Sequence, residues 1–178
     1  IVYPNYPAFA ADGRLYVTDS GGWKSNDGSI LCIEPGGRTT RVGTPPLLFP
    51  NGLAMLDDWL YVVESTLPGI TRVRRDGSNR ETVLMLDRAI PDGIAFDADG
   101  GLWIGCWQPN RILRLSPTGS LDVIADDWSG IEVLTPNNLA FAGPDLAELA
   151  FPALGGNFVR AFRPGVRGRP LHYPKVSP

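Results

Sequence analysis

Four copies of one short pattern run along the chain, and their spacing leaves few folds open. Each copy begins with proline followed by asparagine or aspartate, then an apolar run and a polar turn, and the first three add a second run with an aromatic residue. The copies are PNYPAFAADGRLYVTDS from Pro4, PNGLAMLDDWLYVVES from Pro50, PDGIAFDADGGLWIGCW from Pro91 and PNNLAFAGPDLAELAF from Pro136. A period of about 40–45 residues with several short strands per copy is typical of β-propeller blades.

The segments between these copies supply the remaining strands of each blade. Pairs of apolar runs separated by turns or short loops occupy 29–35 with 38–43, 70–77 with 81–86, and 111–119 with 121–126. The sequence therefore predicts an all-β propeller of four-stranded antiparallel blades. An antiparallel sandwich would explain the strands but not the repeated pattern. At about 45 residues per blade, the chain holds about four blades in a single domain over residues 1–178, which we expect to be incomplete at its N-terminal side.

Composition narrows the classes of partner. The 16 basic and 19 acidic residues give a net charge of −3, which argues against nucleic acid. No apolar run approaches twenty residues, so no membrane span is expected, and no signal peptide is visible, which leaves the compartment open. Cys32 and Cys106 show no metal-binding spacing and are expected to be small buried hydrophobes. His172 is the only histidine, and we expect it to pack or lie at the surface.

The second residue of each copy is an anchor residue with a side-chain oxygen. Because radial repetition places equivalent positions on a circle around the propeller axis, the anchors are expected to face the central channel. Amide and carboxylate oxygens suit hard cations such as calcium, magnesium or manganese. The alternative is that these side chains only bond to the backbone ahead of a strand. The four anchor residues are Asn5, Asn51, Asp92 and Asn137.

Two other sets of polar residues recur with the pattern. Asp12, Asp58 and Asp99 fall in the hairpin turns, where aspartate is favoured by turn chemistry, so we expect them to be structural. A second set, Asp19, Glu64 and Trp107, should finish near the anchors. The two acids of this set are either solvated loop residues, which is the favoured interpretation, or groups that orient ligands.

The motifs of the repeat resemble a known family. FPNGLAMLDDWLYVVES, IPDGIAFDADGGLWIGCW and NNLAFAGPDLAELAF, with the closing ALGGNFVRAFRPGVRGRPLHYP, resemble the senescence-marker-protein/gluconolactonase family, also called regucalcin-like. The resemblance covers nearly the whole chain and corresponds to roughly the last two-thirds of the family chain, without its front blade or blades. It implies a six-bladed propeller with one divalent cation in the central channel, and hydrolysis of lactones or, in some relatives, of organophosphates.

The resemblance also implies roles for particular residues. The cation ligands would be Asn51, in a Pro-Asn-Gly motif, and Asp92, in a Pro-Asp-Gly motif. Asn5 matches an asparagine that contacts substrate or the water bound to the metal, although Tyr6 stands where the family usually has aspartate. The family's fourth asparagine matches Asn138 better than the anchor beside it, and its first-blade glutamate ligand has no counterpart. Calcium is the expected cation, with zinc, manganese or magnesium as alternatives.

The predicted function is metal-dependent opening of a sugar lactone by a cation-activated water, with Asp92 as the general base. A phosphotriester substrate would fit the same site. The alternatives are a non-catalytic propeller that binds a ligand or partner, and an inactive fragment of a lactonase. Because an open propeller exposes strand edges and apolar blade faces, a homo-oligomer that covers them is also expected.

Overall fold

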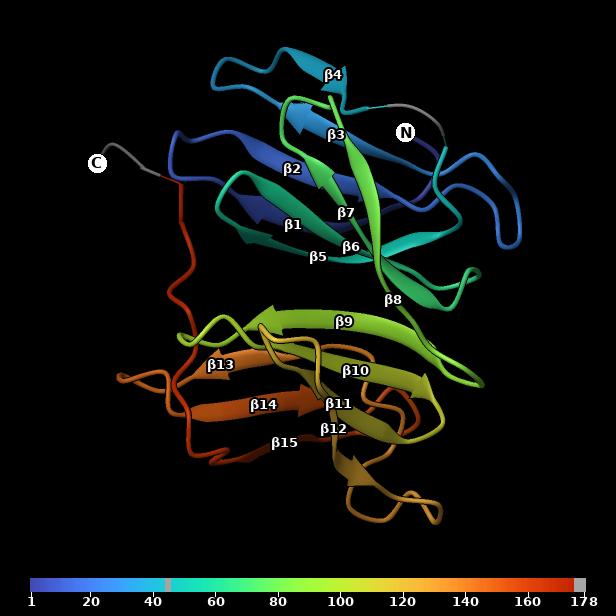
Figure 1. Cartoon of the computed structure of the whole chain (residues 1–178), viewed down its shortest axis with the longest axis vertical. Coiled ribbons are helices and arrows are strands. Elements are labelled where there is room, and N and C mark those ends of the chain that lie inside the picture. The colour runs from blue at the N-terminus through green and yellow to red at the C-terminus, as the bar shows by residue number, and fades with distance from the viewer. Residues whose placement is uncertain (44–45, 175–178) are drawn as a thin grey trace. The chain divides into compact units, whose positions relative to one another are not determined.

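The computed structural model describes residues 1–43 and 46–174, which form antiparallel strands and turns without any helix (Figure 1). It follows that these residues include no apolar helix of membrane-spanning length. The chain divides into two compact units. The first comprises Ile1–Met85 with the C-terminal segment from Leu171, and the second comprises Leu86–Pro170.

The first unit holds two complete four-stranded blades in which sequential strands are neighbours. In both, all four strands correspond to predicted runs, and the outer strand has three residues in blade 1 and six in blade 2. Blade 1 is β1 (Pro4–Phe9), β2 (Leu15–Asp19), β3 (Ser29–Ile33) and β4 (Thr39–Arg41). Blade 2 is β5 (Pro50–Leu56), β6 (Trp59–Glu64), β7 (Gly69–Arg74) and β8 (Arg80–Met85).

The second unit holds one four-stranded blade and one of three strands. Blade 3 is β9 (Ile90–Phe96), β10 (Leu102–Gln108), β11 (Arg111–Leu115) and β12 (Leu121–Asp126). Blade 4 is β13 (Ala140–Ala142), β14 (Glu148–Pro152) and β15 (Val159–Phe162). The all-β propeller fold predicted from the repeat is confirmed, with the difference that blade 4 has three strands in the described residues. The prediction of a single domain stays a prediction.

Burial across a blade explains why the middle strands are the most apolar. In β6 and β10 nearly every side chain is buried, as expected for short continuous apolar runs, whereas β4 and β12 are almost wholly exposed. Each unit has its own core. The first is built around Tyr16, Ile30, Leu53, Leu60 and Val62, and the second around Trp103, Ile112, Leu139, Leu149 and Phe151. Both cysteines are buried and unpaired, as predicted.

The hairpin turns follow the predicted chemistry. Asp12, Asp58 and Asp99 all lie in turns between the first and second strands of their blades. Gly13 and Gly100, next to two of these acids, have φ angles of 82° and 84°, a left-handed conformation that glycine adopts without strain. His172 is exposed, as expected for a surface position, and its backbone forms an isolated antiparallel bridge with Phe9.

Aspartate 97 is a buried carboxylate that the repeat pattern did not single out. It lies just after β9 with none of its surface exposed. Its oxygens accept hydrogen bonds from the backbone N–H of Gly101 at 2.7 Å, from Trp103 Nε1 at 2.9 Å and from Arg114 Nε at 2.8 Å. Burial alone would raise the pKa of Asp97, but the bonds from Arg114, Trp103 and Gly101 outweigh it and hold that pKa below its ordinary value.

A second carboxylate, Asp127, organises the loop that follows β12. It accepts hydrogen bonds from the backbone N–H groups of Val133, Glu132 and Gly130 at 2.9, 2.6 and 3.0 Å, and from the Ser129 hydroxyl at 2.7 Å. The bond from Val133, followed by that from Ser129, lowers the pKa of Asp127 far below its ordinary value.

This lowered pKa predicts a pH-dependent contribution to stability. Since the folded pKa lies below the unfolded value of about 3.9, the contribution is present above that value and is lost as the pH falls toward the folded pKa. Asp127→Asn should therefore lower the melting temperature at pH 7, and its gap to wild type should narrow below about pH 4. Thermal melts across pH check this, with Asp122→Asn on exposed β12 as the control. A gap for Asp127→Asn that stays constant with pH would contradict the assignment.

Candidate functional site

Three of the four anchor residues lie at the start of the first strand of a blade. Asn5 is in β1, Asn51 in β5 and Asp92 in β9, and each is half-buried. The sequence had suggested that the anchors precede these strands, but the structure places them within the strands. Asn137 differs, because it lies outside any strand and three residues before β13 begins. The fourth repeat therefore does not present its anchor as the other three do.

Each of the three strand anchors is the first residue of a β-bulge. In blade 1, Pro4 pairs with Asp19 and Pro7 with Val17, so two residues face a single residue on β2. The same two-against-one count occurs between Pro50 and Leu53 and between Pro91 and Ile94 in the next two blades. Bulges re-aim side chains and are frequent beside functional sites. The bulge therefore recurs at the anchor in each of the first three blades.

In the first unit, the side-chain amide of Asn5 is tied to a buried serine. Asn5 Nδ2 donates to Ser20 Oγ at 3.0 Å, and Ser20 Oγ donates in turn to the backbone carbonyl of Pro50 at 2.7 Å. Ser20 has no exposed surface. This chain of bonds runs from the anchor of blade 1 to the residue that precedes the anchor of blade 2.

The amide of Asn51 is held in the same way. Asn51 Nδ2 donates to Ser65 Oγ at 3.3 Å, and the backbone carbonyl of Asn51 accepts from the Thr18 hydroxyl at 2.8 Å. Among the described residues, neither Asn5 nor Asn51 receives a hydrogen bond at Oδ1. Because one N–H of each amide is bonded to a serine within the protein, each anchor has its carbonyl oxygen as the available acceptor.

In the second unit, Asp92 lies near the buried thiol of Cys106. Burial raises the pKa of that thiol to about 12, with Arg111 opposing and the charge of Asp92 adding to the rise. Cys106 is therefore a protonated thiol at neutral pH, which does not favour a role as nucleophile. Asp92 remains the ionisable candidate of this strand.

The glycine after Asp92 permits a close approach between two segments of the second unit. A Cβ atom on Gly93 would stand 2.5 Å from Asn138 Cα and 2.7 Å from Asn138 Oδ1. Asn138 Oδ1 also accepts the backbone N–H of Leu139 at 2.8 Å. The Asn138 side chain is thus used locally, which agrees with its expected lack of a ligand role.

The two acids predicted to finish near the anchors are buried structural groups, so the favoured interpretation as solvated loop residues is wrong. Asp19 is 3% exposed and accepts the backbone N–H groups of Val2 and Tyr3. Burial would raise the pKa of Asp19, but the bonds from Tyr3 and Val2 lower it overall. Glu64 is fully buried and binds Arg80 Nη2 at 2.7 Å as well as the hydroxyl of Thr71.

The strand register also corrects the third member of that set. Asp19, Glu64 and Cys106 occupy the same position, because they pair with Pro4, Pro50 and Pro91. Trp107 is therefore equivalent to the following residues, Ser20 and Ser65, rather than to the acids. Serines 20 and 65 are the site residues that the sequence analysis missed. The Asp-Ser and Glu-Ser pairs that end the second strands were the signal that could have found them.

The donor set determines which cation could bind. Within residues 1–43 and 46–174, no group of three or more histidine, cysteine, aspartate or glutamate side chains is arranged to hold a metal ion. A cation at the anchors would consequently need amide oxygens beside a carboxylate. The Oδ1 atoms of Asn5 and Asn51 fit that requirement in donor type, since hard cations bind amide carbonyls as well as carboxylates.

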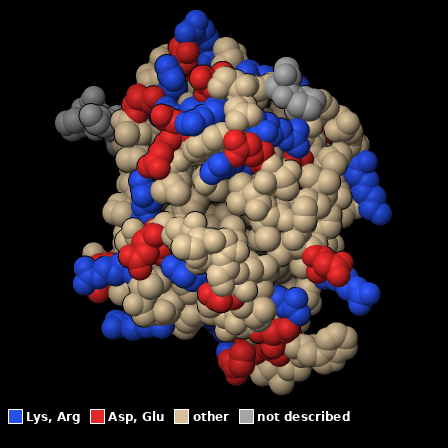
Figure 2. Space-filling view, viewed as in Figure 1, with Lys and Arg blue, Asp and Glu red and all other residues tan. Residues whose placement is uncertain are grey.

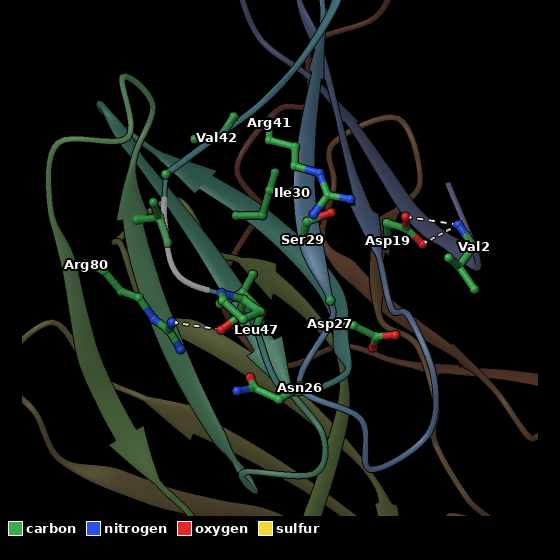
Figure 3. A pocket seen from close by; sticks show the side chains of 14 residues that line it. Val2, Asp19, Asn26, Asp27, Ser29, Ile30, Arg41, Val42, Leu47 and Arg80 are labelled. Atoms are coloured by element: carbon green, nitrogen blue, oxygen red, sulfur yellow. Dashed lines mark hydrogen bonds between the residues drawn. The ribbon is translucent and has the colours of Figure 1, made fainter.

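A cavity of about 430 Å³ opens elsewhere in the first unit (Figure 3). Asp19, Asp27, Arg41 and Arg80 line it together with apolar residues such as Leu47, and Figure 3 shows Arg41 reaching toward Ser29. Neither Asn5 nor Asn51 lines this cavity. On the face of the molecule in Figure 2, acidic and basic side chains are mingled without a continuous basic patch.

The antiparallel blades define this protein as a β-propeller. In three of the blades, a β-bulge in the first strand holds an asparagine or aspartate side chain. The chain belongs to the SMP-30/gluconolactonase/LRE-like family, whose model matches residues 2–152 and so includes Asn5, Asn51 and Asp92. The family resemblance expected from the repeat is therefore confirmed.

Two curated proteins and one solved structure illustrate the relationship. Regucalcin of Xenopus laevis is 32% identical over 137 residues, and 6-deoxy-6-sulfogluconolactonase of Pseudomonas putida is 31% identical over 134 residues. Each match covers 70% of this chain but only 43% and 44% of those proteins, so the chain spans less than half the length of these relatives. The structure of a calcium-binding protein, regucalcin from Agrobacterium tumefaciens, superposes with a TM-score of 0.67 at 23% identity, covering 83% of this chain and 52% of that one. That likeness shows the fold.

Proposed function

We propose that this chain carries the metal-site blades of a lactone hydrolase of the gluconolactonase type. The observation that carries the proposal is the pair of anchor amides whose Nδ2 atoms are tied to Ser20 and Ser65 while their Oδ1 atoms remain available. The family match across residues 2–152 and the sulfogluconolactonase among the relatives support a lactone as the substrate class.

The three strand anchors would have different roles, one in binding substrate and two in binding a cation. Asn51 in the first unit and Asp92 in the second would each offer an oxygen ligand to a divalent cation, as the family resemblance implies. Calcium is the first choice because oxygen ligands suit it and one structural relative is described as calcium-binding. Asn5 would bind the substrate through its Oδ1 atom, which accepts a hydrogen bond from a sugar hydroxyl or from the incoming water. When bound, a divalent cation supplies Lewis-acid polarisation of a carbonyl oxygen.

The reaction follows from these assignments. A water molecule adds its oxygen to the lactone carbonyl carbon, the ring C–O bond breaks, and the ring oxygen leaves as a hydroxyl, which yields a hydroxy acid. Asp92 would accept the proton of the attacking water as general base and would give it to the ring oxygen as the C–O bond breaks. An anchor that is half-buried suits this role, because it lies beside solvent yet is held by its strand.

The test is a thermal melt with calcium, magnesium, manganese and zinc. A ligand that binds only the folded state stabilises it by about 2.7 kcal/mol at 100 times its dissociation constant, so calcium should raise the melting temperature by several degrees. The same shift should be absent in Asn51→Ala and retained in Asn138→Ala, whose amide is used locally. No shift with any of the four cations would contradict the proposal. A shift without hydrolysis of a simple sugar lactone would favour a non-catalytic binding propeller.

A further inference from the structure

The buried serines beside the anchors, rather than the anchors alone, determine what the first unit offers to a ligand. An asparagine side chain can turn either its carbonyl oxygen or its amino group toward solvent, and its hydrogen-bond partners decide which. In this unit each anchor amide has a serine hydroxyl opposite its amino group. Both serines follow directly on the second strand of their blade, and they are 0% and 3% exposed.

We infer that Ser20 and Ser65 are positioning residues, which turn the Asn5 and Asn51 amides so that both present Oδ1 to the bound cation or substrate. The inference rests on the proposed function for the identity of the ligand, but the orientation itself rests on the hydrogen bonds. For Ser20 the direction of the chain is fixed. Its hydroxyl has one proton, which goes to the Pro50 carbonyl, so it can only accept from Asn5 Nδ2.

Hydrogen bonds from blade 1 also hold the backbone around the anchor of blade 2. Ser20 binds the carbonyl of Pro50, and Thr18 binds the carbonyl of the next residue, Asn51, while also accepting the backbone N–H of Tyr6. The bulge that holds Asn5 and the bulge that holds Asn51 therefore share two buried hydroxyl groups. A change at Ser20 should reach both anchors, although Ser20 itself lies behind them and has no exposed surface.

The serines also account for the type of anchor in each blade. A carboxylate opposite Ser20 would have no N–H to donate, and it would compete with the Pro50 carbonyl for the single hydroxyl proton. An amide avoids this conflict, and blades 1 and 2 have asparagine. In blade 3 the equivalent of the serines is Trp107, which has no hydroxyl, and there the anchor is Asp92. The position after the proline's partner on the second strand thus holds serine where the anchor is neutral and tryptophan where it is charged.

The experiment compares Ser20→Ala with Ser29→Ala. Ser29 is a suitable control because it is a buried serine of the same blade whose Oγ has no hydrogen-bond partner among the described residues. Two properties are measured on the whole chain: hydrogen exchange of the Asn5 side-chain amide by NMR, and the dissociation constant of calcium by calorimetry. Ser20→Ala should speed the exchange. Because Ser20 also holds the Pro50 carbonyl next to the proposed ligand Asn51, the change should raise the calcium dissociation constant about tenfold or more. Ser29→Ala should change neither.

Each outcome decides a separate point. Unchanged Asn5 exchange in a folded Ser20→Ala protein would overturn the inference, and so would faster exchange with unchanged calcium affinity, because Ser20 would then hold the Asn5 amide without positioning Asn51, the proposed cation ligand. If Ser20→Ala fails to fold, Ser65→Ala with the Asn51 amide signals provides the same comparison. A wild-type chain that binds none of the four cations would contradict the proposed function instead, and the amide signals alone would then decide whether the serine orients the amide.

Discussion

Asp97→Ala is expected to lower the free energy of unfolding by about 3 kcal/mol, the largest stability effect predicted for a single side chain of this protein. The reason is that Asp97 is fully buried and Arg114 is mostly so, with their atoms 2.8 Å apart. Removal of the carboxylate leaves the Arg114 guanidinium and the indole N–H of Trp103 without their partner. Urea unfolding followed by tryptophan fluorescence measures the loss.

Asp99→Ala is the matched control for this prediction. Asp99 lies two residues further along in the exposed part of the turn, so its loss should change the free energy of unfolding by about 0.5 kcal/mol or less. The double variant Asp97→Ala/Arg114→Ala should cost less than the two single changes added together, because no unpaired charge remains. Equal costs for Asp97→Ala and Asp99→Ala would show that the buried pair does not stabilise the second unit.

Asp92→Asn is expected to have the largest effect on function. The change keeps the shape of the side chain but removes the only charge among the three strand anchors. Turnover of a sugar lactone, measured as kcat/KM, should fall by about 10²–10⁴-fold if Asp92 is the general base. The calcium-induced rise in melting temperature should disappear, while the melting temperature without calcium should change little.

Asp99→Asn provides the same chemical change on the same hairpin. Along an extended strand of about 3.3 Å per residue, Asp99 lies roughly 20 Å from Asp92, too far to share a ligand. It should keep both the calcium shift and turnover. Asp92→Asn protein that still binds calcium and hydrolyses the lactone at the wild-type rate would sink the assignment of Asp92. Loss of both properties in the Asp99 variant would mean that the wrong set of aspartates had been taken as the site.

The blades could be predicted because the information for them is local. Alternating apolar runs, Asp-Gly turns such as that at Asp99, and the recurring proline with its anchor specify strands and hairpins within about twenty residues. The family resemblance then implied Asn51 and Asp92 as cation ligands. The position of those anchors within bulges was not predicted, because a bulge depends on how one strand pairs with the next, and the sequence states no register.

The roles of the other polar residues depended on burial, which a repeat pattern does not reveal. Asp19 and Glu64 resemble loop acids in sequence, yet both are enclosed by backbone N–H groups or by Arg80. Asp97 stands in the first position of a turn, where aspartate is commonplace, and only the packing of Trp103 and Arg114 over it makes it a buried hub.

By itself, the sequence determined the propeller blades, their period and the oxygen chemistry of the anchors, since these follow from local pattern and residue type. Only the tertiary structure decided which way each anchor amide faces. That orientation is fixed by the hydroxyl of a serine at the end of the neighbouring strand. For Ser20, the hydroxyl is itself held by the backbone carbonyl of Pro50 in the next blade, 30 residues further along the sequence. A side-chain amide can turn either end outward, and it is the contact across strands, not the residue itself, that selects the carbonyl oxygen.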